Sequence, residues 1–476
     1  MNHSLKKLIN NLQYEVINGK VSDIEINQLS FDTRKVSKGD IFICMKGARF
    51  DSHSQIADVM KANPKAIIVE KNNEYLKTYI FDTDVLVLQV PDTRIALAVV
   101  SKSFFDNPDT KLKIIGITGT KGKTTTAFMI REILEANGFK VGMIGTIGIF
   151  YEDNHIITDN TTPGSFMLME YFKKMVDAGI EYVVMEVSSQ SLKYNRVYGI
   201  NFEYAVWTNI MPEHIGENEH DDYRDYLESK LKIFTMSKNA VINSETDEYD
   251  KVVDVVLKNH VKLFEKKEDM SFKLSIPGAH NQSNASLAYT FGKALSIDDK
   301  IIREALSRTT VPGRIEEVYS DDKIKIIVDF SYEGNGAKKL FETLKNVDHK
   351  RIVAIFGCGG NRSKDRRYAM GEVCGQMSDF IILTADNSRY EKTIDIIKDI
   401  ESTLTKYKEK DNTDDGYIII EDRREAIRYA IKNRKDGDLI CVMGKGHEPY
   451  MEMNGELVKF LDKEVIYEIL KEEGLA

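Results

Sequence analysis

The stretch IIGITGTKGKTTTA, from Ile114 to Ala127, decides the fold of the middle of the chain. An apolar run leads into a glycine-rich turn, and the residues after it follow a helical pattern that stops at Gly138. A strand, a glycine turn and a helix in this order form the setting of a phosphate-binding loop. The Walker pattern fails by one position, because Ile117 stands where its first glycine belongs. We therefore predict a shortened loop in which Gly119 and Gly122 make the turn.

The residue types of this loop suit a nucleotide phosphate. Glycines let backbone N–H groups point inward, and Lys123 adds a positive charge. The Thr124 hydroxyl stands at a helix start, where the dipole favours anions and where a threonine can coordinate magnesium. The alternative is a plain strand–turn–helix connection, which gives no reason for a GKT sequence followed by two further threonines.

Length and composition set the broad class. The chain has 476 residues, more than one hydrophobic core normally serves, so we expect two to four domains. The net charge of -9 argues against a general nucleic-acid binder, which would carry a basic face. Four cysteines without CxxC spacing favour a reducing cytoplasm over a disulfide framework or a thiolate zinc site. The first apolar run is too short for a signal peptide, and no segment approaches the ~18 apolar residues of a membrane span.

From about Lys113 onward, short β-rich runs alternate with helical patterns, which predicts an α/β fold with parallel sheets covered by helices. We expect three domains, over residues 1–108, 109–312 and 313–476, with a candidate hinge at Val311-Pro312-Gly313. Polar residues stand where the predicted strands end, and parallel sheets bind ligands outside those ends. These positions are Thr118 to Thr125, Glu186 to Ser189, Asn209, Asp329, Asn361 to Arg362, Asp386 to Arg389, and Lys445 to Glu448.

Two of these strand ends carry candidate metal ligands. Glu186 ends the strand YVVMEV, and His214 follows the strand that ends in TNI. Hard cations favour oxygen ligands and accept imidazole, so both residues suit a magnesium ion near the loop. Alone, each would more simply be a surface carboxylate or a capping histidine. Lys230 lies in a helical stretch with Leu227 and Leu231, where a lysine is normally a solvated charge and spacing alone does not nominate it.

The third region carries a second polar set. Arg362 follows the glycine turn of IFGCGGNRSKDRR, Asp386 and Arg389 lie in TADNSRYE, and Glu448 ends MGKGHE. Guanidinium and carboxylate groups in one place favour a pocket for a small molecule that bears both carboxylate and amine groups. The alternative is a solvated charged rim.

The motifs of the chain resemble those of the Mur ligases, in the same order and over nearly the full length. They are GTKGKTTTA, NTTPG, MEVSSQSL, TNIMPEH, ESKLKIF, PGAHNQSN, VPGRIEEV, FGCGGNR, ADNSR and GKGHE. The resemblance implies a smaller α/β N-terminal domain, a central P-loop parallel-sheet domain and a C-terminal Rossmann-like domain. It also implies a cytoplasmic enzyme, which we expect to be a monomer.

The resemblance implies an activity as well. ATP, with Mg2+, would phosphorylate the free carboxylate of a UDP-N-acetylmuramoyl-L-alanyl-D-glutamate, and the amine of a free amino acid would attack the acyl phosphate. The product would carry the third residue of the peptidoglycan stem peptide, meso-diaminopimelate or a related diamino acid. Cationic groups and magnesium would stabilise the charge of the transition state.

The resemblance also assigns roles to residues that match its motifs. The catalytic set would be Lys123, Glu186, His214 and Lys230. Magnesium would be held by Thr124, Glu186, His214 and Lys230, the last as a carbamylated lysine. ATP would contact Gly119, Thr120, Lys121, Gly122, Lys123, Thr124, Thr125, Asn281, Arg314 and Asp329. The UDP-muramoyl-dipeptide would contact Thr33, Asn160, Thr161, Thr162, Ser188 and Arg196. The incoming amino acid would contact Arg362, Asp386, Asn387, Ser388, Arg389, Gly444 and Glu448.

Several positions depart from the family pattern. The element DNPR, linked to the selection of meso-diaminopimelate, occurs here as DNSR: Arg389 remains as an anchor for a distal carboxylate, but the lost proline predicts a looser loop. Lys121 stands where asparagine is common, and EHIGENEH replaces DHLDYH. Further departures are Gly164 at the end of TTPG, Gln190 in place of a histidine in MEVSSQ, and Tyr332 in place of another histidine.

Three alternatives remain at this stage. A divergent paralogue could couple another amino acid to another carboxylate in a secondary pathway, which the departures favour. A folate polyglutamylating ligase shares the loop, but FDTRKVSKGD and DNSR argue against it. A catalytically inactive binding protein would have no need of the retained Lys123, Thr124, Glu186, His214 and Lys230.

Overall fold

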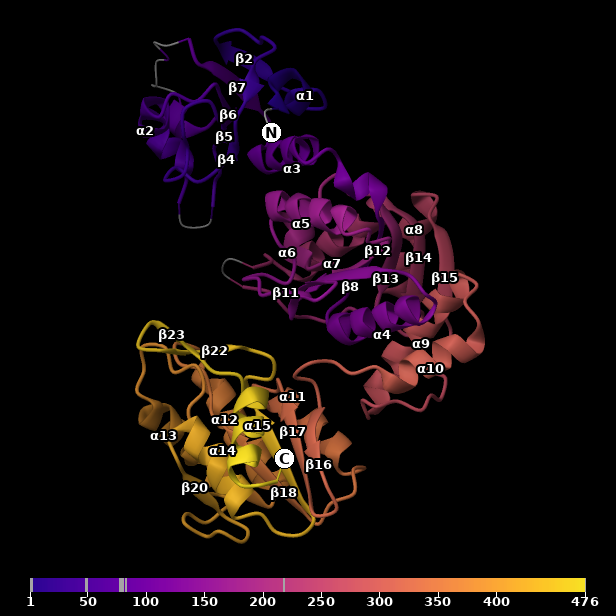
Figure 1. Cartoon of the computed structure of the whole chain (residues 1–476), viewed down its shortest axis with the longest axis vertical. Coiled ribbons are helices and arrows are strands. Elements are labelled where there is room, and N and C mark those ends of the chain that lie inside the picture. The colour runs from indigo at the N-terminus through magenta and orange to yellow at the C-terminus, as the bar shows by residue number, and fades with distance from the viewer. Residues whose placement is uncertain (1–2, 48–49, 77–80, 82–83, 217–218, 476) are drawn as a thin grey trace. The chain divides into compact units, whose positions relative to one another are not determined.

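The computed structural model describes residues 3–47, 50–76, 81, 84–216 and 219–475 (Figure 1). The chain divides into two compact units, one made of Met1–Lys273 with Gln282–Ser307 and the other of Leu274–Asn281 with Arg308–Ala476. Each unit is a mixed α/β structure built on sheets of mainly parallel strands, as the alternation of patterns predicted. Among the described helices, none combines the length and the apolar character that crossing a bilayer requires.

The first unit begins with a five-stranded sheet in the order β2-β7-β6-β5-β4. Strands β4 to β7 run parallel, while β2 pairs antiparallel with β7 at one edge. Ala96, Leu97 and Val100 of helix α3 (Thr93–Phe104) pack into the core on one face of the sheet. The strands are β2 (Glu15–Asn18), β4 (Leu29–Ser30), β5 (Ile41–Ile43), β6 (Ala66–Glu70) and β7 (Leu86–Val90), with helices α1 (Leu5–Ile9) and α2 (Ile56–Lys61) and the short pair β1 (His3–Ser4) and β3 (Glu25–Ile26).

An eight-stranded sheet in the order β11-β10-β9-β12-β8-β13-β14-β15 follows in the same unit. Its strands are β8 (Lys113–Thr118), β9 (Val141–Gly145), β10 (Gly148–Tyr151), β11 (Asn154–Ile156), β12 (Tyr182–Glu186), β13 (Phe202–Trp207), β14 (Ser237–Asn243) and β15 (Lys262–Lys266). The helices are α4 (Lys123–Ala136), α5 (Ser165–Asp177), α6 (Ser189–Lys193), α7 (Tyr223–Leu231), α8 (Tyr249–Lys258), α9 (Ala279–Ala294) and α10 (Asp299–Arg308). The pairs β9–β10 and β10–β11 are antiparallel, so β10 is the strand among these eight that runs against the others.

The order of the central strands positions the candidate site. Strand β8 lies between β12 and β13, and all three are parallel. Glu186, at the end of β12, pairs with Ile117, and Trp207, at the end of β13, pairs with Thr118. The phosphate loop, the MEVSS segment and the TNI segment therefore leave one edge of the sheet side by side.

The second unit contains a six-stranded sheet in the order β16-β17-β21-β18-β19-β20. All neighbours are parallel except β16 and β17. The strands are β16 (Glu316–Ser320), β17 (Ile324–Asp329), β18 (Arg351–Phe356), β19 (Phe380–Leu383), β20 (Tyr417–Ile419) and β21 (Asp438–Met443). The helices are α11 (Gly334–Leu344), α12 (Lys364–Met377), α13 (Thr393–Leu404), α14 (Arg423–Lys432) and α15 (Asp462–Glu472), and strands β22 (Tyr450–Met453) and β23 (Glu456–Lys459) form a separate hairpin.

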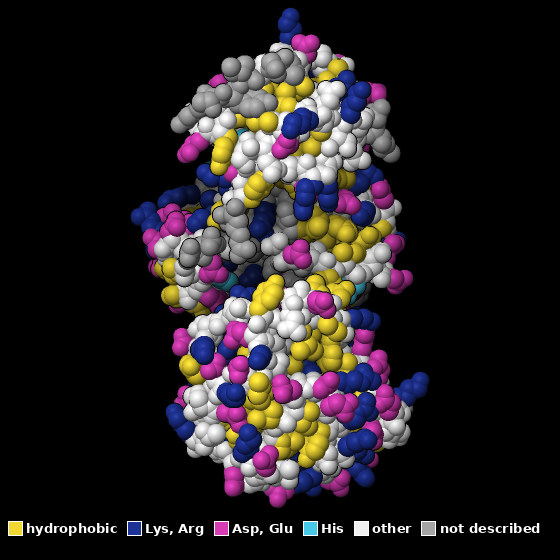
Figure 2. Space-filling model, turned by 90° about the vertical axis from the view of Figure 1, so that its left-hand side faces the viewer, with side chains coloured by type: hydrophobic (Ala, Val, Ile, Leu, Met, Phe, Trp, Pro, Cys, Tyr) yellow, Lys and Arg dark blue, Asp and Glu magenta, His cyan; other side chains and the backbone are white. Residues whose placement is uncertain are grey.

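The cysteines and the charged side chains are distributed differently. Cys44, Cys358, Cys374 and Cys441 are all buried free thiols. Basic and acidic side chains are interspersed over the surface of the second unit on the face shown in Figure 2, which agrees with a mixed composition and a net charge of -9.

Candidate active site

The phosphate loop has the backbone geometry that its glycines predicted. Gly119 and Gly122 have φ values of +146° and +84°, which residues with a side chain rarely adopt. A Cβ atom at Gly119 would collide with the Thr208 hydroxyl, and one at Gly122 would lie 2.5 Å from Oδ1 of Asn284. Gly122 is the N-cap of α4 and has no side chain of its own to cap the helix. The start of a helix favours the binding of an anion, so this end of α4 suits a phosphate.

Lys123 and Lys121 differ in their surroundings. The ammonium of Lys123 donates to the carbonyl oxygens of Gly119 and Thr120, at 2.9 and 3.1 Å, and so lies across the loop. The ammonium of Lys121 forms an ion pair of 2.6 Å with Glu213. Its backbone N–H donates to Oδ1 of Asn209 at 2.9 Å, which fixes the loop against the segment after β13.

Glu186 is a buried carboxylate that faces the start of α4. Its side chain is fully buried and accepts hydrogen bonds of 3.0 Å from Thr124 and of 2.9 and 3.2 Å from the backbone and hydroxyl of Thr146. Among the described residues, no lysine, arginine or histidine lies within ion-pair distance of it. A buried carboxylate without a countercharge is costly, and oxygen donors suit Mg2+, so Glu186 and Thr124 fit a magnesium site.

Lys230 is buried, against the expectation of a solvated charge. It is 1% exposed, donates to the Gly119 carbonyl at 2.8 Å and lies 4.8 Å from the ring centre of Tyr226. Spacing within the helix could not show this, because it does not tell that α7 turns this face toward the phosphate loop. Burial, together with the nearby charge of Lys123, holds the pKa of Lys230 well below its usual range. Burial therefore favours the neutral, nucleophilic form of this amine.

Tyr226 joins the parts of this site. Its hydroxyl lies 3.0 Å from that of Thr120, and its ring centre lies 6.0 Å from that of His214. His214 has a φ of +59° and a side chain 47% exposed, and its carbonyl accepts a hydrogen bond of 3.0 Å from the N–H of His220. Sequence patterns missed Tyr226, since it occupies an ordinary apolar position of a helix. No three His, Cys, Asp or Glu side chains gather as a metal site in the described part of the chain, so the candidate set depends on Thr124 and Lys230 as well.

The NTTPG segment lies beside Glu186. The Thr162 hydroxyl donates to the Glu186 carbonyl at 2.9 Å and accepts the Ser188 N–H at 3.0 Å, while Arg196 donates to the Thr162 carbonyl at 3.1 Å. Burial lowers the pKa of Arg196. Thr161 reaches Thr146 at 3.1 Å, and the Asn160 carbonyl accepts the Thr158 hydroxyl at 3.0 Å. The structure thus brings together five of the six residues predicted for the dipeptide substrate. Thr33 lies in a turn after β4 and shares no hydrogen bond with them within the described ranges.

Three predicted ATP contacts belong to the second unit. Asp329, at the end of β17, accepts the N–H groups of Ile315 and Ser331, both at 2.8 Å. Arg314 lies 4.9 Å from the ring centre of Phe330, and buried Asn281 donates to the Pro277 carbonyl at 2.9 Å. Arg314 and Asp329 thus lie close together, on the connection into β16 and at the end of its partner strand β17.

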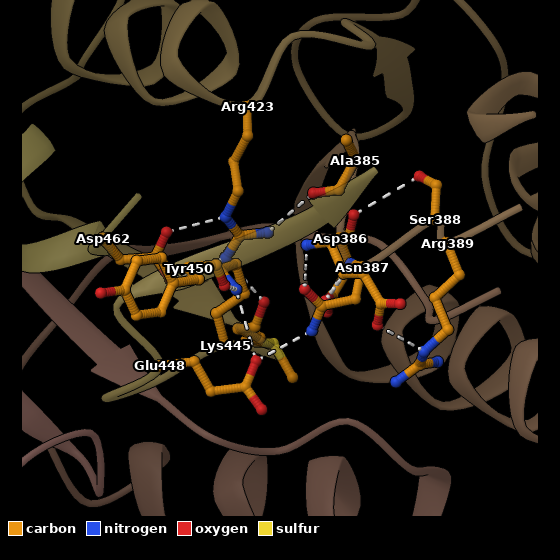
Figure 3. A network of polar contacts seen from close by, with 12 residues as sticks. Ala385, Asp386, Asn387, Ser388, Arg389, Arg423, Lys445, Glu448, Tyr450 and Asp462 are labelled. Atoms are coloured by element: carbon orange, nitrogen blue, oxygen red, sulfur yellow. Dashed lines mark hydrogen bonds and ion pairs between the residues drawn. The ribbon is translucent and has the colours of Figure 1, made fainter. Parts of the chain in front are cut away.

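The residues of the third region that were predicted to contact the incoming amino acid line one cavity of about 240 Å³, with the exception of Ser388. Asp386 is almost fully buried, and a side chain at Gly444 would collide with its carboxylate. Asn387 donates to Glu448 at 2.9 Å (Figure 3). The lining residues are Phe330, Tyr332, Cys358, Gly359, Arg362, Ser363, Arg366, Arg367, Asp386, Asn387, Arg389, Gly444 and Glu448.

The DNSR loop is held by hydrogen bonds in place of a proline ring. Ser388 is buried, and its hydroxyl lies 2.7 Å from that of Thr393. Arg389 has a φ of +51°, and its guanidinium donates to Glu452 at 3.0 Å and to the Gly360 carbonyl at 2.6 Å. These contacts supply the restraint that the sequence alone predicted to be missing.

A buried ion pair supports the same pocket from behind. Arg423 and Asp462 are both fully buried and lie 2.7 Å apart. Arg423 also donates to the carbonyl of Ala385 at 3.2 Å (Figure 3). It donates to the carbonyl of Met443 at 3.0 Å as well. These carbonyls directly precede Asp386 and Gly444. Sequence patterns missed the pair, because its members lie on different helices.

Comparison with known proteins agrees with the resemblance drawn from the motifs. Residues 117–267 match the Mur ligase middle domain, and residues 313–446 match the Mur ligase glutamate ligase domain. The chain belongs to the Mur ligase family. This Mur ligase is therefore an ATP-dependent enzyme that forms an amide bond in peptidoglycan precursor synthesis, as the motifs predicted.

The similarity to individual relatives covers nearly the whole chain. It is 37% identical to the UDP-N-acetylmuramoyl-L-alanyl-D-glutamate–2,6-diaminopimelate ligase of Clostridium perfringens, covering 98% of this chain and 99% of that protein. The enzyme of the same name from Clostridioides difficile is 34% identical with the same coverage. A solved ligase of this name matches the fold of this Mur ligase with a TM-score of 0.66 at 22% identity, over 100% of both chains. A Mycobacterium tuberculosis folylpolyglutamate synthase matches the fold with a TM-score of 0.56 at 18% identity, over 74% of this chain and 92% of that one.

Proposed function

We propose that this Mur ligase joins meso-diaminopimelate to the free carboxylate of UDP-N-acetylmuramoyl-L-alanyl-D-glutamate. The observation that carries the proposal is the cavity of the second unit, which combines Arg362 and Arg389 with Asp386 and Glu448. Guanidinium groups bind carboxylates and carboxylates bind ammonium groups, so this set suits an amino acid with charged groups at both ends. The relatives named as 2,6-diaminopimelate ligases support the same substrate.

In this proposal the phosphate loop binds ATP and prepares the first half of the reaction. Transfer of the γ-phosphoryl group to the substrate carboxylate gives an acyl phosphate and ADP. The N–H groups at the start of α4 and the Lys123 ammonium would hold the phosphate oxygens. Bound Mg2+ supplies charge stabilisation at the transferred group, and Thr124 and Glu186 would hold it.

Lys230 and His214 would complete the metal site. In its neutral form, which burial favours, the amine of Lys230 can add CO2 with loss of a proton, and the resulting carbamate is an oxygen ligand. His214 lies beside the ring of Tyr226, as Lys230 does, and its side chain is exposed enough to reach a ligand.

The second half of the reaction needs the free amine of the amino acid close to the acyl phosphate. Arg362 and Arg389 would bind its carboxylates, and Asp386 and Glu448 would bind its ammonium group. Such binding orients the nucleophile and lowers the entropic cost of the attack. Phosphate leaves as the amide forms. Thr33, Asn160, Thr161, Thr162, Ser188 and Arg196 would hold the UDP-muramoyl-dipeptide.

The remaining parts of the proposal concern the cell and the chain. We propose that the enzyme works in the cytoplasm as a monomer, and that its domains span residues 1–108, 109–312 and 313–476. Size-exclusion chromatography with light scattering tests the monomer directly.

A panel of amino acids tests the proposed substrate. Phosphate release would be measured with ATP, Mg2+ and UDP-N-acetylmuramoyl-L-alanyl-D-glutamate, with meso-diaminopimelate, lysine, ornithine or glutamate as acceptor. We expect the highest kcat/KM for meso-diaminopimelate. Turnover only with another acceptor, or only with another carboxylate, would favour a specialised paralogue instead.

A further inference from the structure

Arg389 is held in place by residues of the β22–β23 hairpin. The Arg389 N–H donates to the Glu452 carbonyl at 2.9 Å, and the Asn454 N–H donates to the Arg389 carbonyl at 2.6 Å. The Glu452 N–H also donates to Oδ1 of Asn387 at 2.9 Å. Glu452 therefore bonds through its backbone to two residues of the DNSR loop and fixes Arg389 in its left-handed conformation.

The side chain of Glu452 sets the direction of the guanidinium. Nε of Arg389 donates to Oε2 of Glu452 at 3.0 Å, and Nη1 donates to the Gly360 carbonyl at 2.6 Å. Contacts at two different nitrogens fix a planar group. Nη2 makes no hydrogen bond within the described part of the chain. It is the nitrogen of this side chain that remains fully available to a ligand in the cavity that Arg389 lines.

Glu452 is not among the described lining residues, but it changes the charge of the cavity through its ion pair with Arg389, which lines it. The ion pair of Arg389 and Glu452 is neutral as a whole, and its side chains are 23% and 32% exposed. Asp386 and Glu448 line the same cavity and are negative. A ligand end that carries only a carboxylate would thus meet Arg389, whose charge Glu452 already neutralises. A ligand end that carries a carboxylate and an ammonium group is itself neutral, and the Arg389–Glu452 pair offers an opposite charge to each of the two groups.

We propose that Glu452 is a specificity-determining residue, which selects amino acids whose far end carries an ammonium group as well as a carboxylate. The inference rests on the proposed function, because it assigns a residue to the choice of the diamino acid. meso-Diaminopimelate has two ammonium and two carboxylate groups and is neutral overall near pH 7. 2-Aminopimelate has the same length and both carboxylates but lacks the far amine, so it carries one negative charge.

Replacement of Glu452 by glutamine tests this role. Glu452→Gln keeps the shape and an acceptor for Nε of Arg389 but removes the charge, which leaves the arginine uncompensated. We expect kcat/KM for meso-diaminopimelate relative to 2-aminopimelate to fall at least tenfold, or about 1.4 kcal/mol. The change should lie in KM, with kcat within about twofold of the wild type. The assay is phosphate release with saturating ATP and UDP-N-acetylmuramoyl-L-alanyl-D-glutamate.

Glu456→Gln is the matched control, since Glu456 is exposed on β23 of the same hairpin and forms no ion pair among the described residues. We expect it to leave the ratio unchanged. A ratio within twofold of the wild type in Glu452→Gln, an equal loss with both amino acids, or the same shift in Glu456→Gln would overturn the role of Glu452. Wild-type enzyme that turns over another acceptor but neither of these two would instead refute the proposed substrate.

Discussion

Removal of the negative charge of Asp462 should destabilise the second unit strongly. Asp462 and Arg423 are both 0% exposed and lie 2.7 Å apart. Asp462→Asn keeps the shape but leaves the Arg423 guanidinium buried without its countercharge. Loss of one partner of a buried ion pair costs about 3–5 kcal/mol. We expect a decrease of this size in the free energy of unfolding, measured by urea denaturation with circular dichroism at 25 °C.

The same structure predicts an incomplete rescue by apolar replacement. A double variant, Arg423→Met with Asp462→Leu, removes both charges and the desolvation cost that they share. It also leaves the carbonyls of Ala385 and Met443 without their hydrogen bonds to the arginine. Each unsatisfied group lowers the free energy of unfolding by about 1–3 kcal/mol. The double variant should therefore stay less stable than the wild type.

A surface arginine next to Arg423 provides the control. Arg424 pairs with Glu468 and Glu472 at the surface, where its side chain is 33% exposed. Such pairs contribute about 0–1 kcal/mol, so Arg424→Met should change stability little. If Asp462→Asn cost less than about 1 kcal/mol, or no more than Arg424→Met, the buried pair would not have the role assigned to it.

Three further predictions concern the chemistry. Lys123→Ala should abolish ligation and keep the fold; phosphate release at a tenth of the wild-type rate or more would contradict the phosphate contact. Arg389→Ala should raise the KM for the amino acid at least tenfold and leave the KM for ATP within twofold, and unchanged selectivity across the amino-acid panel would refute its anchoring role. Lys230→Met should abolish ligation but stabilise the fold. In the unfolded chain Lys230 binds a proton below its usual pKa of 10.5, whereas burial lowers this pKa in the folded protein, so that the proton binds there only at a lower pH. The gain of Lys230→Met in the free energy of unfolding by urea should therefore grow as the pH falls from about 10, and a gain independent of pH would contradict the lowered pKa of Lys230.

The sequence predicted those parts of the site that depend on local order along the chain. The loop after β8 follows from a strand, two glycines and a helix, and Glu186 follows from its position at a strand end. Both inferences need only the rule that parallel strands present their carboxyl ends at one edge. The burial of Lys230 depends instead on which face of α7 meets the loop, and spacing within the helix cannot give that.

Partners that are distant in sequence were beyond the reach of local patterns. Glu452 meets Arg389, and Asp462 meets Arg423, across gaps of 63 and 39 residues. The sequence around Glu452 is typical of any exposed hairpin, and the sequence around Asp462 is typical of any helix start, so neither segment indicates a buried or paired carboxylate. Their roles arise only once the chain has brought β22 and α15 next to loops of the six-stranded sheet.

The departures from the family pattern are best understood through their contacts. Lys121, where asparagine is common, and Glu213, where aspartate is common, form an ion pair of 2.6 Å with each other. The added positive charge beside the phosphate loop is thus offset by a carboxylate whose longer side chain reaches it. Ser388, which replaces a proline, bonds to Thr393, and the loop around it is held by Glu452. A site without a function would have no need to balance its changes in this way, because nothing would act against an uncompensated charge or a loosened loop. We therefore infer that these substitutions have been accommodated within an active ligase, and that the Lys121 and Glu213 pair can be tested as a unit: reversal of both charges should keep more activity than reversal of either one alone.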